Sequence, residues 1–181
     1  MSPSYNAGML YSDRAEAGRA LAERLSDYAG RRDLLVLALP RGGVPVGAAL
    51  ARALGAPLDV FVVRKLAAPA QPELALGAIA SGGARVLNSG VIEQLGIDSE
   101  QIERITAAET LELNRREELY RDGLAPMDPR GRLVILVDDG MATGATMRAA
   151  ARALRKLGAG RVIGALPVSS PEAVELLEPE I

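Results

Sequence analysis

Hydrophobic positions follow two different patterns along the chain. Four short segments are almost continuously apolar, which is typical of buried parallel strands: residues 34–39, 58–63, 133–137 and 161–168. Segments with helical spacing or helix-start signals surround them: residues 13–28, 45–54, 143–157 and a short helix from Pro171 that Ser170 caps. This order predicts an α/β fold, an open, mostly parallel, twisted sheet flanked by helices.

The middle of the chain is less regular. Residues 66–76 contain two prolines and no clear period, so we expect a loop, followed by strand-like pieces at 77–80 and 85–88. Ser99 is expected to cap a long charged helix that reaches residue 121 and lies on the surface. Residues 122–132 contain two prolines and two glycines, which predicts a linker.

The length of 181 residues suits one domain with a sizeable core. We expect that core to comprise residues 13–65 and 130–178. Residues 66–129 would form an inserted loop and a helical hood.

Composition removes several classes of protein. The chain has no cysteine and no histidine, which excludes disulfides, thiolate metal sites, histidine triads and most zinc sites. A metal here should be a hard cation such as Mg2+. The net charge of −2 and the scattered basic residues give no support for nucleic-acid binding. No apolar run reaches the roughly 18 residues of a membrane span, and residues 1–10 lack the features of a secretory signal. We therefore expect a cytoplasmic protein with no membrane partner.

The most informative stretch runs from Val134 to Thr146. Four apolar residues end in two carboxylates, Asp138 and Asp139, and a loop of small residues with Thr143 and Gly144 leads into a helix. Backbone amides at a helix start, with threonine hydroxyls and a glycine, can bind an anion. The carboxylates can accept hydrogen bonds from vicinal hydroxyls or orient water around a metal. A phosphorylated sugar satisfies both halves.

Two further loops follow predicted strands and should lie at the same edge of the sheet. Arg41, Gly42 and Gly43 come after the first strand, where glycines let the backbone approach a diphosphate and arginine can neutralise it. An ordinary strand-to-helix connection is the alternative. Arg64 and Lys65 end the second strand, and a solvated strand end is the alternative there.

The stretch from Val134 to Thr146 resembles the thirteen-residue signature of type I phosphoribosyltransferases, which binds 5-phosphoribosyl-1-pyrophosphate (PRPP). The resemblance implies that Asp138 and Asp139 face the ribose hydroxyls and act in catalysis with Lys65. It implies a further set of substrate-binding residues: Arg41, Gly42, Gly43, Arg64, Ala142, Thr143, Gly144, Ala145 and Thr146.

The whole chain also resembles a bacterial group of phosphoribosyltransferase-like proteins whose acceptor is uncharacterised. The shared elements are Leu-Pro-Arg-Gly-Gly at residues 39–43, Arg-Lys-Leu at 64–66 and a Pro-Glu…Gly-Ala-Ile-Ala element at 72–80.

The resemblance implies a reaction, in which a nitrogenous acceptor, such as a nucleobase, displaces pyrophosphate from PRPP with Mg2+ as cofactor. A flexible loop, residues 66–76, would close over the site. Ala142 stands where the 6-oxopurine enzymes carry an aspartate, which disfavours that acceptor class. The partners would be PRPP and a small-molecule acceptor, and a homodimer is compatible with the sequence.

Two other classes stay open. One is a PRPP-binding regulator of the same fold without turnover. The other is an Asp-Asp metal site in a receiver-like or phosphatase-like fold.

The resemblance also bears on the backbone before Arg41. Related enzymes hold a non-proline cis peptide in the pyrophosphate loop. The matching bond here joins Pro40 to Arg41.

Overall fold

The computed structural model describes residues 11–141 and 143–181. Two expectations therefore fall outside the described residues. One is the absence of a secretory signal in residues 1–10, and the other is the contact of Ala142 with a phosphate.

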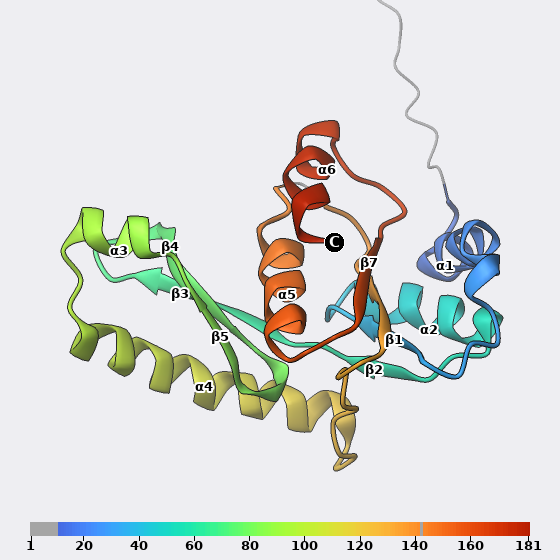
Figure 1. The fold of residues 1–181 in the computed structure, drawn as a ribbon, viewed down its shortest axis with the longest axis horizontal. Helices are drawn as coiled ribbons and strands as arrows, with labels where there is room; N and C mark the ends of the chain where they lie inside the picture. The colour runs from blue at the N-terminus through green and yellow to red at the C-terminus, as the bar shows by residue number, and fades with distance from the viewer. Residues whose placement is uncertain (1–10, 142) are drawn as a thin grey trace, which may run out of the picture.

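A four-stranded parallel sheet forms the centre of the protein (Figure 1). Its strands occur in the spatial order β2 (Leu58–Val60), β1 (Leu34–Ala38), β6 (Leu133–Val137) and β7 (Arg161–Ala165). Every residue of β1 and β6 is buried, as expected for strands covered on both faces. The predicted fold class, an open parallel sheet flanked by helices, is confirmed.

The helices cover the two faces of this sheet because alternate strand residues point in opposite directions. Leu34 and Val36 pack with α1 (Arg14–Arg24) and α2 (Gly43–Leu54) on one face. Leu35 and Leu37 pack with α5 (Ala145–Lys156) and α6 (Pro171–Leu177) on the other. Ser170 caps α6 through its hydroxyl, as predicted.

A second unit, which we call the hood, comprises Val63–Arg121. It contains a three-stranded antiparallel sheet in the order β3 (Val63–Ala68), β4 (Gln71–Ala80) and β5 (Ala84–Leu87), together with α3 (Ser89–Leu95) and α4 (Ser99–Arg121). Figure 1 shows the hood projecting to one side of the parallel sheet, with α5 between them. The hood has its own apolar cluster, which includes Leu66, Leu76, Ile79 and Leu113. Short 3₁₀ turns occupy Ser26–Tyr28, Ser81–Gly83 and Glu178–Glu180.

The expectation of a loop at residues 66–76 was wrong, because β3 and β4 pair as a hairpin over most of this stretch. Register shifts follow Leu66 and Ala67, and Ala67 pairs with Ala75 whereas Ala68 pairs with Gln71. Pro72 therefore lies in the irregular part of the ladder, where a missing amide costs little. This segment is consequently part of a sheet and not an unstructured lid.

Three smaller expectations also need correction. The single strand predicted at residues 58–63 divides into β2 and the start of β3, which belong to different sheets. The cap of α4 is Asp98 and not Ser99, because the Asp98 carboxylate accepts from the amide of Gln101 at 2.7 Å. The short helix α3, capped by Asn88, was not predicted. The surface position of α4 is confirmed, since it buries only Ile102, Leu113 and Arg121.

The hood is fastened to the parallel sheet at both ends of its sequence. Arg121, only 8% exposed, donates from Nε to Asp59 Oδ1 and from Nη2 to the carbonyl of Val60, both at 2.9 Å. The other oxygen of Asp59 accepts from the amide of Met127 at 2.9 Å. The Asp59 carboxylate therefore contacts the end of the hood and the segment that returns to the parallel sheet. Among the described residues, no helix is long and apolar enough to cross a membrane.

Candidate functional site

Two loops meet where β1 and β6 end, one after each strand. These strands are adjacent and parallel, with Ala38 opposite Val137, so their carboxyl ends lie at the same edge. The edge carries the start of α2 at Gly43, the pair Asp138 and Asp139, and the start of α5 at Ala145. This is the position at which open α/β sheets bind ligands.

Asp139 is fixed from two sides. Arg14, in the first turn of α1, donates to its Oδ2 from Nε at 2.9 Å and from Nη2 at 2.7 Å. On the other side a Cβ added to Gly42 would lie 2.0 Å from the same oxygen, so any side chain at this position would displace the Asp139 carboxylate. The loop after β1 and the carboxylates after β6 are therefore in direct contact, and Oδ1 of Asp139 stays available as an acceptor.

Asp138 occupies a more enclosed position. Burial raises the pKa of its carboxyl from 3.8 to about 6, and the nearby charge of Asp139 acts in the same direction. The amide of Asp139 donates to Asp138 Oδ1 at 2.8 Å, which opposes that rise. The ionised carboxylate thus lacks a neutralising partner comparable to Arg14, and it would gain from donors supplied by a ligand.

The loop before α5 has the geometry of an anion cradle. Gly144 has φ of 72°, a left-handed conformation that favours glycine, and it turns the chain into the helix. Thr143, Ala145 and Thr146 are exposed at this end of α5. The first amides of the helix have no partner within it, so they and the threonine hydroxyls can bind a phosphate.

The loop after β1 has the backbone that the family resemblance predicts. The peptide bond between Pro40 and Arg41 is cis. Arg41 is exposed beyond it, and its guanidinium can reach a ligand at this edge.

Arg64 and Lys65 point to opposite sides of β3, as neighbouring strand residues do. Arg64 turns toward α4, where its Nη2 lies 2.6 Å from Glu109 Oε2. Lys65 lines a cleft together with Thr146 of α5, and its Nζ donates to the carbonyl of Pro72 at 2.7 Å. The structure therefore brings Lys65, and not Arg64, to the side that faces the α5 loop.

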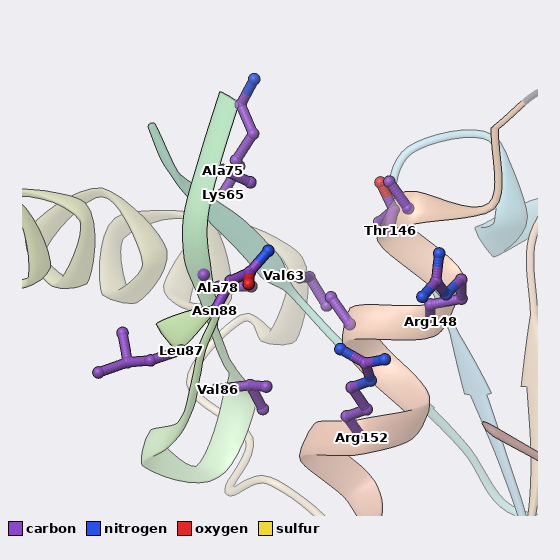
Figure 2. A pocket seen from close by; sticks show the side chains of 13 residues that line it. Val63, Lys65, Ala75, Ala78, Val86, Leu87, Asn88, Thr146, Arg148 and Arg152 are labelled. Carbon is purple, nitrogen blue, oxygen red and sulfur yellow. The ribbon is translucent and has the colours of Figure 1, made fainter. Parts of the chain in front are cut away.

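That cleft has a volume of about 260 Å³ and lies between the hood and α5 (Figure 2). Its basic side chains are Lys65, Arg148 and Arg152. We call it the hood cleft.

Three basic residues of this region escaped the sequence analysis. Arg14 carries no sequence signal, because its partner lies 125 residues away. Arg148 and Arg152 could have been noticed, since the i,i+4 spacing places two cations on one helix face just after the candidate phosphate loop.

The described residues contain no group of three or more histidine, cysteine or acidic side chains arranged to hold a metal. Asp138 and Asp139 supply two carboxylates only. Such a set fits Mg2+ whose remaining oxygen ligands come from a bound phosphate compound and water.

Comparison with known proteins indicates the same family that the sequence resembles. The model of the phosphoribosyl transferase domain family matches residues 7–178. Proteins from two strains of Mycobacterium tuberculosis, named only provisionally as phosphoribosyl transferases, are 46% identical over 165 residues. The match covers 91% of this chain but only 37% of those relatives, so the chain spans little more than a third of their length.

A solved structure and a smaller enzyme complete the comparison. A crystal structure of a protein from Thermus thermophilus is similar with a TM-score of 0.83 and 46% identity, over 94% of this chain and 81% of that one. An adenine phosphoribosyltransferase from Albidiferax ferrireducens is 33% identical over 124 residues, which are 64% of this chain and 61% of that enzyme.

Proposed function

This chain belongs to the phosphoribosyl transferase domain family, and on that premise we propose that it binds PRPP with Mg2+ and transfers the phosphoribosyl group to a nitrogenous acceptor. The observation that carries the proposal is the contact between the loop after β1 and the loop after β6 at one sheet edge. Gly42 lies against Asp139, and the anion cradle of Thr143–Thr146 starts four residues later. A ligand with a phosphate at one end, a diphosphate at the other and a diol between them matches the order of cradle, carboxylates and glycine loop.

Each part of PRPP has a counterpart in the site. The 5-phosphate would lie on the amides and hydroxyls of residues 143–146. The ribose hydroxyls would donate to Asp138 and Asp139, whose ionised oxygens are acceptors only. The diphosphate would lie over Gly42 and Gly43, with Arg41 and Lys65 as its cationic partners.

In this reaction the protein would orient the ribose and stabilise the charge that develops on the leaving diphosphate. The bond from C1 to the diphosphate breaks as the acceptor nitrogen forms its bond to C1, so positive charge develops on the ribose and negative charge on the leaving group. Asp138 and Asp139 would hold the ribose, and Arg41 and Lys65 would stabilise the departing charge. Mg2+, when bound beside the two carboxylates, supplies additional positive charge to the diphosphate.

A nucleobase is the acceptor class that we favour. The 33% identity to an adenine phosphoribosyltransferase supports this class, although it covers only 64% of the chain. The alternative is a regulator of the same fold that binds PRPP without turnover.

The test is PRPP binding by calorimetry with Mg2+, for the wild type and for Asp138→Asn/Asp139→Asn. Hydrogen bonds to charged acceptors contribute about 1.5–3 kcal/mol each, so the double variant should bind at least about tenfold more weakly. Asp27→Asn, at an exposed carboxylate outside these two loops, is the matched control. Equal affinity in the wild type and the double variant would refute the assignment. Pyrophosphate release with a panel of nucleobases then separates an enzyme from a regulator.

A further inference from the structure

We propose that Arg14 is a positioning residue that acts as a built-in counter-ion of Asp139. In this role it orients one carboxylate oxygen toward the ribose hydroxyls and withholds the carboxylate pair from free divalent cations, so that the metal enters the site together with PRPP. The inference rests on the proposed function, because it assigns a task within the same site. Arg14 itself lies outside both loops of that site and belongs to α1.

The position of Arg14 is fixed by the packing of α1 against α2, which Figure 1 shows side by side. Gly18 follows Arg14 by one turn, so both residues share a helix face. A Cβ on Gly18 would overlap the carbonyl oxygen of Val46 and lie 2.7 Å from the Cβ of Ala49, both in α2. The two helices therefore approach each other closely here. Because α2 starts in the loop after β1, this packing also brings Arg14 to the carboxyl edge of the sheet.

The start of α1 is fixed as well. The Asp13 carboxylate caps the helix by accepting from the amide of Glu16 at 2.7 Å. The Glu16 carboxylate in turn accepts from the amide and the hydroxyl of Ser12. The backbone of the first turn is therefore well defined, and the long side chain of Arg14 starts from a fixed point.

Two nitrogens of Arg14 converge on one oxygen of Asp139. Nε lies 2.9 Å and Nη2 lies 2.7 Å from Oδ2. Gly42 lies against this same oxygen. The carboxylate is therefore held at Oδ2, which leaves Oδ1 as the acceptor for a ribose hydroxyl. A lysine could make only a point contact here, whereas the planar guanidinium also fixes the orientation.

The charge of the carboxylate pair explains the second part of the role. Among the described residues, Arg14 is the only ion-pair partner of either Asp138 or Asp139. It neutralises one of the two negative charges, repels a second cation and occupies an oxygen that this cation would use. A free Mg2+ ion, which requires near-ideal oxygen geometry and dehydrates reluctantly, should therefore bind weakly. The diphosphate of PRPP supplies the oxygens and the negative charge that the pair lacks.

Stability is a poor explanation for this ion pair. The side chain of Arg14 is 59% exposed and that of Asp139 is 32% exposed. Exposed ion pairs contribute little to the free energy of unfolding, because water screens the charges and both side chains lose freedom. A role toward the ligand therefore accounts for the pair better than a role in holding α1 in place.

Binding of Mn2+ without PRPP tests the counter-ion role, because Mn2+ uses the same oxygen ligands as Mg2+ and its EPR signal reports the free ion. Arg14→Gln should bind Mn2+ at least about tenfold more tightly than the wild type. Arg14→Lys, which keeps the charge, should stay near the wild type. Arg19→Gln, at an exposed arginine of the same helix, is the matched control and should change nothing. Adding Asp139→Asn to Arg14→Gln should remove the gain, because Asp139 would then be the ligand that Arg14 had withheld.

Calorimetry with PRPP at saturating Mg2+ tests the positioning role. Arg14→Gln should weaken PRPP binding at least about tenfold, because Oδ1 of Asp139 is no longer held toward the ribose. Arg14→Lys should weaken it by less, since it keeps the charge but loses the planar fork. The midpoint of urea unfolding should be that of the wild type in both variants, because the ion pair is exposed.

Three results would overturn the proposal. They are equal Mn2+ affinity in the wild type and Arg14→Gln, unchanged PRPP affinity in Arg14→Gln, and a large drop in its urea midpoint, which would identify a structural ion pair. The Mn2+ titration contains no PRPP, so it decides the counter-ion role by itself. Failure of the wild type to bind PRPP would instead count against the proposed function.

Discussion

The substitution Asp138→Asn tests how the site balances stability against binding. Burial raises the pKa of this carboxyl to about 6 from 3.8, so at neutral pH the folded protein holds a charge that burial disfavours. Asparagine has nearly the same shape, and its Oδ1 can still accept the amide of Asp139, which lies 2.8 Å from Oδ1 in the wild type. The variant therefore removes the charge and little else.

The size of the effect follows from the change in pKa. A difference of about two units corresponds to at most about 3 kcal/mol, at about 1.4 kcal/mol per unit. The carboxyl is only partly buried, and solvent screening reduces this to about 1 kcal/mol. Because the pKa of Asp138 is raised in the folded state, the native protein binds more protons than the unfolded chain between about pH 4 and 6. This carboxyl therefore makes stability fall as pH rises through that window, and the loss is complete above it.

Urea unfolding at pH 8 and at pH 4 measures the prediction. Asp138→Asn should be more stable than the wild type by about 1 kcal/mol at pH 8, and the gap should nearly close at pH 4. The same variant should bind PRPP more weakly at pH 8, since it loses a charged acceptor. A variant that is less stable than the wild type at pH 8, or a gap independent of pH, would refute the reasoning.

Three other predictions concern the Arg121–Asp59 ion pair, the contact of Gly42 with Asp139, and the metal. Arg121→Met breaks a buried ion pair and should lower the free energy of unfolding by about 3–5 kcal/mol in urea, whereas the exposed Arg104→Met should change it by less than about 0.5 kcal/mol. Equal losses in the two variants would contradict this. Gly42→Ala should weaken PRPP binding at least about tenfold because its Cβ would overlap a carboxylate at 2.0 Å, and Gly90→Ala, with its nearest contact at 3.7 Å, should not. Chelation of Mg2+ should abolish PRPP binding in calorimetry, and unchanged affinity in EDTA would show that no metal takes part.

The core of the fold was predictable because its signals are local. Residues 34–39 and 133–137 are apolar without interruption, and burial on both faces of a parallel sheet produces that pattern. The Ser170 cap was equally predictable, because a serine before a proline marks a helix start through contacts within one turn.

The hood was less predictable for physical reasons. Its hairpin contains two register shifts and an irregular segment around Pro72, which disrupt the period of two that identifies strands. The division of residues 58–63 between two sheets depends on tertiary contacts and has no local signal. Asp98 was overlooked as a cap because Ser99, the next residue, is also a good capping residue.

The candidate site also contains some residues that the sequence could group and others that it could not. Asp138, Asp139 and the Thr143–Thr146 loop are contiguous, so sequence alone could group them, and their roles toward PRPP stay predictions. The contact of Arg14 with Asp139 could not be foreseen, since it joins residues 125 positions apart. The opposite directions of Arg64 and Lys65 follow from a strand that the sequence analysis ended too early.

The two contacts of the Asp59 carboxylate have a consequence for protein engineering. Because this one carboxylate binds both Arg121 and the amide of Met127, the hood leaves and rejoins the core at neighbouring points. Such an insertion can in principle be exchanged between relatives as a cassette, with residues 59–127 as its natural boundaries. A chimaera that keeps both Asp59 and Arg121 should fold with a foreign hood, whereas one that splits this pair would bury an unpaired charge at the junction. The hood could then be varied by recombination while the loops after β1 and β6 stay untouched.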